Sequence, residues 1–130
     1  MKMTAAAQHV LRDSRRVGRV LARVGDKWSV MVIVSIHAGP RRFNEIKRGI
    51  DGISQQMLTR TLRALERDGF VTRTIIPATP PQVEYALTEL GRSLSGPVLR
   101  LGQWACEHIA QVDAAQRRFD EKDEAAQGGV

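Results

Sequence analysis

The segment DGISQQMLTRTLRALERDGF, residues 51 to 70, carries two faces with different chemistry. Leu58, Leu62 and Leu65 recur at spacings of four and three, which predicts the apolar side of a helix. The opposite side carries side chains that can hydrogen-bond to base edges, namely Gln55, Gln56, Thr59, Arg60 and Arg63. Glutamine can pair with adenine, arginine with guanine, and threonine can contact a thymine methyl group, each good pair discriminating by roughly 1 to 3 kcal/mol. The combination favours readout of DNA bases, although any one of these residues could equally be an ordinary solvated side chain.

Both ends of this helix are marked in the sequence. Ser54 stands where an N-cap residue belongs, and Gly69 follows the last leucine turn, where a left-handed residue ends many helices. The supporting elements must therefore hold a defined helix with its polar face outward.

Basic residues surround this segment. The chain has 20 Lys and Arg against 14 Asp and Glu, a formal net charge of +6, which favours an acidic partner such as nucleic acid or an anionic membrane surface. Phosphate contacts position a protein on DNA without reading its sequence. We expect six residues to contact phosphates, or to contact DNA from a hairpin whose tip is stiffened by Pro80-Pro81. They are Arg41, Arg42, Lys47, Ser54, Arg73 and Gln82.

The remaining periodicities predict the other elements. Apolar residues at helical spacing predict an N-terminal helix over 5–24, a helix starting near Asp26, a short helix within 41–50 and a C-terminal helix over 89–112. The second of these is rich in β-branched residues, so a strand is the alternative there. Gly96-Pro97 could kink or restart the last helix, and residues 113–130 are expected to fray.

Between these helices, FVTRTII and QVEYAL alternate with a period of two on either side of the loop PATPP, which predicts a β-hairpin. Helix, short helix, turn, capped helix and hairpin are the order of a winged helix-turn-helix, in which the capped helix enters the major groove. We therefore predict a single domain over residues 1–130, mainly α with a small β-hairpin (α+β), with residues 25–88 as its winged core.

Residues 25–94 also resemble the HxlR-type family of bacterial winged helix-turn-helix transcription regulators. The pieces GDKW, GPRRFNEI, GISQQMLT, LRALERDG and PPQVEYALTELG carry the resemblance, in this order. It implies a homodimer joined by the N-terminal and C-terminal helices, bound to a pseudo-palindromic operator with half-sites roughly 34 Å apart. The regulator could be a repressor released by a small-molecule or stress signal. The expected interface residues are Val10, Val17, Leu21, Leu94, Leu101, Trp104 and Cys106.

The sequence departs from the family pattern at three places. Where many members carry a sensing cysteine before the tryptophan of KW, this chain has Ser14 or Arg15. Gln56 and Gln82 stand where the family often has a basic residue. Both glutamines should lower the affinity for DNA or shift the preferred site.

Other functions are disfavoured by composition. No apolar run approaches the 18 residues of a membrane span, and the N-terminus lacks a signal peptide, so we expect a cytoplasmic protein. The single cysteine, Cys106, is expected to be a buried thiol, with an inter-chain redox thiol as the alternative. We expect no metal, no cofactor and no enzymatic activity. A pocket for a small-molecule effector beside Trp28 or Trp104 stays open, as do a protein-interaction module and a nonspecific architectural DNA binder.

Overall fold

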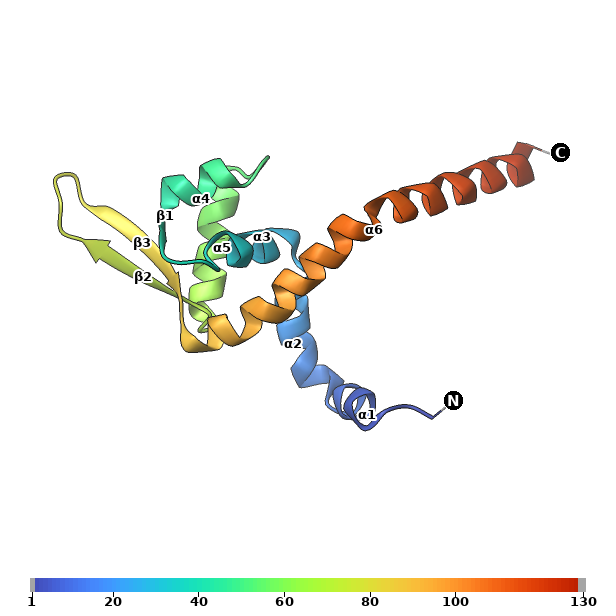
Figure 1. Ribbon diagram of the computed structural model, residues 1–130, viewed down its shortest axis with the longest axis horizontal. Helices are drawn as coiled ribbons and strands as arrows, with labels where there is room; N and C mark the ends of the chain where they lie inside the picture. The colour runs from blue at the N-terminus through green and yellow to red at the C-terminus, as the bar shows by residue number, and fades with distance from the viewer. Residues whose placement is uncertain (1, 129–130) are drawn as a thin grey trace. The chain divides into compact units, whose positions relative to one another are not determined.

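The computed structural model describes residues 2–128 as a mainly helical chain with one small sheet (Figure 1). The elements are α1 (Ala5–Arg12), α2 (Ser14–Gly25), α3 (Lys27–Ser35), β1 (Arg41–Arg42), α4 (Phe43–Gly49), α5 (Gln55–Arg67), β2 (Val71–Ile76), β3 (Gln82–Leu87) and α6 (Glu89–Gly128). The predicted fold class is confirmed. Contacts divide the chain after Val98 into two compact units, and α6 contributes to both.

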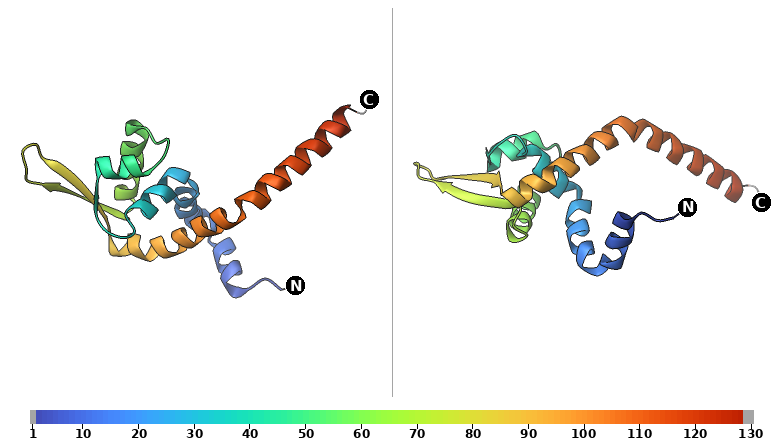
Figure 2. Two further views of the ribbon diagram at one scale, coloured as in Figure 1. Left: turned by 45° about the horizontal axis from the view of Figure 1, so that its top comes forward. Right: turned by 60° about the horizontal axis from the view of Figure 1, so that its bottom comes forward.

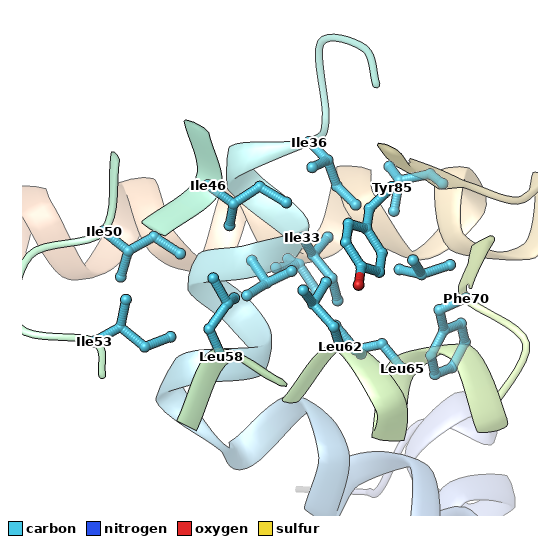
Figure 3. Close-up of a cluster of buried hydrophobic side chains, with 14 residues drawn as sticks. Ile33, Ile36, Ile46, Ile50, Ile53, Leu58, Leu62, Leu65, Phe70 and Tyr85 are labelled. Carbon is cyan, nitrogen blue, oxygen red and sulfur yellow. The ribbon is translucent and has the colours of Figure 1, made fainter. Parts of the chain in front are cut away.

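The core of the first unit is built around the leucine ladder of α5. Leu58, Leu62 and Leu65 are at most 1% exposed and pack with apolar residues from α3, α4 and the sheet (Figure 3). Burial of each such side chain contributes roughly 1.5 to 3 kcal/mol. The ladder thus fixes which side of α5 faces solvent.

Helix α3 forms despite its β-branched residues, so the predicted helix is confirmed and the strand alternative was wrong. The carboxylate of Asp26 accepts hydrogen bonds from the backbone N–H of Trp28 and the hydroxyl of Ser29, which caps the helix. Val32 and Ile33 are completely buried against α5, whereas Met31 is 48% exposed. Capping and one-sided burial together outweigh the modest β preference of the sequence.

The sheet has three antiparallel strands in the order β1-β3-β2. The predicted hairpin of β2 and β3 is confirmed, and two further views show it extending as an arm beyond the helices of the first unit (Figure 2). The third strand, β1, was not expected: Arg41 pairs with Tyr85 and Arg42 with Glu84. Two arginines show no alternation of apolar residues, so only pairing with β3 defines this strand.

The N-terminal prediction of one helix over 5–24 is corrected to two helices. Asp13 separates α1 from α2, with φ −103° and ψ 26°, and its carbonyl accepts the first hydrogen bonds of α2 from Arg16 and Val17. Aspartate competes with the helical backbone for hydrogen bonds and so favours helix ends over helix interiors.

The expectation of a frayed tail from residue 113 was wrong within the described residues, because α6 continues to Gly128. Residues 114–127 consist largely of strong helix formers such as Ala, Gln, Arg, Glu and Lys, with no glycine or proline. Arg117 has an acidic residue four positions away on each side, Asp113 and Glu121, and such pairs stabilise an exposed helix. Nor does the helix restart at Pro97, which lies inside α6.

Candidate nucleic-acid interface

The start of α5 is held by its predicted cap. The hydroxyl oxygen of Ser54 accepts a hydrogen bond from the backbone N–H of Met57 at 3.0 Å. At the far end Gly69 has φ +84°, the left-handed conformation that glycine adopts without strain. Both predicted helix ends are therefore confirmed, and the first turn of α5 is fixed in orientation.

Loss of the Ser54 cap should measurably destabilise the domain. Ser54→Ala is expected to cost about 1 kcal/mol, because the Met57 N–H loses its acceptor. Thermal unfolding followed by circular dichroism measures this as a fall of roughly 3 to 8 °C in Tm. Ser93→Ala is the matched control, since this exposed serine only donates to the Leu90 carbonyl. Equal melting of the two variants would contradict the capping role.

The polar face of α5 is solvent-exposed and hollowed. Its five members line one open hollow on the surface: Gln55, Gln56, Thr59, Arg60 and Arg63. All five are exposed. The structure therefore brings together the whole set that sequence reasoning selected for base readout, on the side of α5 away from the leucine ladder.

Thr59 presents a restricted chemistry on this face. Its hydroxyl donates to the carbonyl of Gln55 at 2.9 Å, so the donor is already used within the helix. What remains is the methyl group and the acceptor capacity of the oxygen. This suits an apolar contact, such as one with a thymine methyl group.

A second hollow, the tip hollow, lies between the start of α4 and the wing, which is the hairpin of β2 and β3. It is lined by Arg42, Phe43, Asn44, Glu45, Arg48, Pro80, Pro81, Gln82, Val83 and Glu84. Of the expected phosphate and wing residues, Arg42 and Gln82 meet here, together with the proline tip. Arg48 was left out of the expected set but lines this hollow, whereas the expected Lys47 does not. Both are exposed on α4, and sequence alone did not show which one faces the wing.

Arg41 and Arg73 lie elsewhere. The Nε of Arg41 donates to the Ser35 carbonyl at 2.9 Å, which ties β1 to the end of α3. Arg73 is exposed on β2 opposite Tyr85. It borders a third hollow, the wing-side hollow, lined by Thr59, Arg63, Glu66, Arg73 and Tyr85.

The arginines of these hollows are not neutralised within the described chain. Among residues 2–128 the ion pairs involve Arg16, Arg23 and Arg67. The shortest joins Arg23 of α2 to Asp68, which ends α5, at 2.6 Å. Acidic groups thus pair away from the polar face of α5, which keeps its positive charge for a partner.

The expected interface residues fall into two groups. Val10, Leu21, Leu101 and Trp104 are 43 to 56% exposed, which suits a surface that lacks its partner in a single chain. Leu94 instead packs against the core of its own unit, and Val17 is half-buried. In the single chain Leu94 therefore has a structural role.

The thiol of Cys106 is exposed, so the expectation of a buried cysteine was wrong for the single chain. At about 100° per residue, Cys106 lies roughly 140° around α6 from Leu101 and off the apolar stripe. A neighbouring pair on the stripe is ordered: the rings of Trp104 and His108 stack with centroids 4.4 Å apart. Trp28 packs against the core with the Lys27 ammonium 4.5 Å from its ring. An effector pocket beside either tryptophan stays a prediction.

A helix-turn-helix formed by α4 and α5, flanked by a β-hairpin wing and carrying an exposed polar helix face, defines a winged DNA-binding protein. The model of the HxlR-like helix-turn-helix family matches residues 23–113, and the chain belongs to that family. The family resemblance seen in the sequence is thus confirmed.

Related proteins and solved structures support this family assignment. The chain is 40% identical over 97 residues to the HTH-type transcriptional regulator YtfH of Escherichia coli (strain K12), covering 75% of this chain and 77% of that protein. The structure of a putative transcriptional regulator, ytfH from Salmonella typhimurium, superimposes with a TM-score of 0.72 at 39% identity, covering 76% of this chain and 88% of the other. The redox regulator HypR in its reduced form gives 0.70 at 38% identity, covering 76% and 98%.

These findings make the chain a transcriptional regulator of the helix-turn-helix type. Regulators of this family are not enzymes, in agreement with the sequence-based expectation. Among residues 2–128, no helix is long and apolar enough to span a membrane. The same residues contain no group of three or more His, Cys, Asp or Glu side chains placed to bind a metal ion.

Proposed function

We propose that the protein binds a specific pseudo-palindromic operator as a homodimer, with the polar face of α5 reading bases in the major groove. Gln55, Gln56, Thr59, Arg60 and Arg63 contact base edges in this proposal. Arg41, Arg42 and Lys47 contact phosphates and hold α5 in register.

One observation carries the proposal. The five residues chosen for their base-reading chemistry line a single exposed hollow that begins at the capped end of α5. In helix-turn-helix proteins the first turns of this helix are the part that reaches base edges. Gln55 and Gln56 are the first two residues of α5, and Arg60 lies within its second turn.

The test is fluorescence anisotropy with a labelled duplex from the DNA next to the chain's own gene, against a scrambled duplex, over a salt series. We expect a preference of at least about a thousandfold near physiological salt. Equal and steeply salt-dependent binding of duplexes covering the whole neighbouring region would favour a nonspecific architectural binder. Absence of binding at low salt would favour a protein-interaction module.

Exposed apolar residues support the homodimer. In the first unit, α1 and α2 expose Val10, Leu11, Val20 and Leu21. In the second unit, α6 exposes Leu101, Trp104, Ile109 and Val112. Soluble monomers rarely leave so many large apolar side chains exposed at helical spacing, and a second copy is the partner that a pseudo-palindromic site requires.

A charge on the α6 stripe should break this dimer. Leu101→Asp is expected to weaken dimerisation at least about a hundredfold, because an unpaired carboxylate would be buried in the interface. Sedimentation velocity over a concentration series measures the change. Gln103→Asp is the matched control, since residue 103 lies roughly 200° around the helix from Leu101. Two variants that both remain dimeric would place the interface elsewhere.

The signal to which this regulator responds, a redox change or a small-molecule effector, is a separate part of the proposal. HypR is described as a redox regulator with reduced and oxidised forms. The present chain has one cysteine, so any disulfide of its own would have to join two chains. A small-molecule effector is the other candidate from the sequence, and thermal shift in the presence of candidate compounds tests it without DNA.

A further inference from the structure

Arg63 belongs to two surfaces at once. It lines the hollow along the polar face of α5 and also the wing-side hollow, where it meets Arg73 of β2. Thr59 is likewise shared, whereas Arg60 borders only the first of these two hollows. At about 100° per residue, Arg60 and Arg63 lie roughly 60° apart around the helix axis, with Arg63 toward the strands.

The wing-side hollow has the chemistry of an anion site. Two arginines from different elements converge on it, and both are exposed. Neither takes part in an ion pair within residues 2–128, although Glu66 lines the same hollow. Guanidinium groups without a carboxylate partner bind phosphate oxygens well, often through two parallel hydrogen bonds.

The backbones of the two arginines belong to elements that pack on the core. Arg73 lies opposite Tyr85 in the β2-β3 ladder, and the ring of Tyr85 packs in the core between α3 and α5 (Figure 3). Arg63 lies next to Leu62, which is 1% exposed. The packing therefore fixes the backbone positions from which both exposed side chains reach the hollow.

The position of Arg63 along α5 argues against base readout. It is eight residues beyond Gln55, which places its Cα roughly 12 Å from the start of the helix. Side chains near the start of such a helix reach base edges, while the flanking parts of the domain meet the backbone. Arg63 thus lies beside the wing and outside the first turns of α5.

We propose that Arg63 and Arg73 together bind one phosphate of the DNA backbone, so that Arg63 sets affinity and register while Arg60 reads a base. This proposal rests on the DNA-binding function proposed above. It reassigns Arg63 from the base-reading set to the phosphate-binding set. Glu66 then opposes the bound phosphate and keeps the overall affinity moderate.

The experiment measures binding of the full-length protein to the cognate duplex and to all single-base variants of one half-site, over a salt series. Arg63→Ala should weaken binding to every duplex by the same factor, about tenfold, and lower the slope of log K against log salt by about 0.9. Its ranking of the base variants should match that of the wild type. Arg67→Ala, which removes one charge from the same helix outside the wing-side hollow, should change binding less than about twofold.

Two further variants test the shared phosphate. The double variant Arg63→Ala/Arg73→Ala should weaken DNA binding by less than the product of the two single-variant factors, because both side chains bind the same phosphate. Glu66→Gln should bind every duplex several-fold tighter, since a negative charge beside the phosphate is removed. Thermal melting of each variant checks that the fold is retained.

The outcomes separate this inference from the function on which it rests. If Arg63→Ala loses discrimination at one base pair, the inference is overturned, while the proposed specific DNA binding stands. Independent losses for Arg63 and Arg73, or an equal loss for Arg67→Ala, would also overturn it. If the wild type shows no sequence preference and Arg63→Ala weakens binding to every duplex equally, the phosphate site is supported and specific operator binding is refuted.

Discussion

Gly91→Ala is expected to lower the free energy of unfolding by about 3 kcal/mol, the upper end of the cost of overpacking. A Cβ atom at position 91 would lie 2.0 Å from the carbonyl oxygen of Phe70 and 3.1 Å from the Leu87 side chain. That carbonyl also accepts the backbone N–H of Thr88, the residue before α6, at 3.0 Å, so its movement would disturb this hydrogen bond. Glycine is needed at this position for the close approach of two backbones.

The close approach joins two parts of the domain. The Thr88 hydroxyl donates to the Gly69 carbonyl at 2.6 Å and accepts the N–H of Gly91 at 2.9 Å. One residue thus connects the end of α5 to the first turn of α6. Separation of these backbones would loosen the link between α5 and α6.

Chemical denaturation and thermal melting measure the Gly91→Ala effect, with an expected fall in Tm of more than roughly 10 °C. Gly49→Ala is the matched control, because a Cβ at that position meets nothing within 4 Å and alanine is the better helix former. It should leave stability unchanged or raise it by up to about 1 kcal/mol. Wild-type stability in Gly91→Ala would mean that the backbones separate at little cost.

The second large effect is on DNA binding. Arg60→Ala should lower sequence specificity, whereas Arg42→Ala should lower the affinity for all DNA. Arg60→Ala is expected to lose roughly 1 to 3 kcal/mol of discrimination at one base pair, a factor of about 5 to 150, because its guanidinium lines the polar face of α5. Arg42→Ala should weaken binding to all duplexes alike and reduce the salt slope by about one. The backbone N–H of Arg42 still donates to Glu45 in that variant, so the start of α4 is preserved.

Anisotropy titrations against the operator and its single-base variants, at several salt concentrations, distinguish the two roles. Arg16→Ala is the matched control, since Arg16 is an exposed arginine of α2 that pairs with Asp13. Equal losses on cognate and random DNA for both Arg60→Ala and Arg42→Ala would refute this division.

Local patterns in the sequence predicted the central helix of the site. The leucine spacing, the Ser54 cap and Gly69 defined α5, because each acts over one or two helical turns and needs no distant partner. Period-two alternation predicted the β2-β3 hairpin for the same reason. The polar side of α5 followed once its apolar side was known, and the structure places that whole set on one hollow.

Tertiary contacts decided the features that carry no local signal. The β1 strand exists through pairing with β3. Arg48 lines the tip hollow and Lys47 does not, because of the way α4 lies against the wing. The partial burial of Leu94 and the exposure of Cys106 depend on where the core of the first unit ends along α6.

The sequence by itself determined the family, the order of the main elements and the chemistry of the α5 face, because these follow from residue types and short-range spacing. The tertiary structure decided that Arg63 shares a hollow with Arg73, ten residues further along the chain. Helical periodicity places Arg63 on the same face as Arg60, but only the packing of β2 beside α5 brings a second arginine to it.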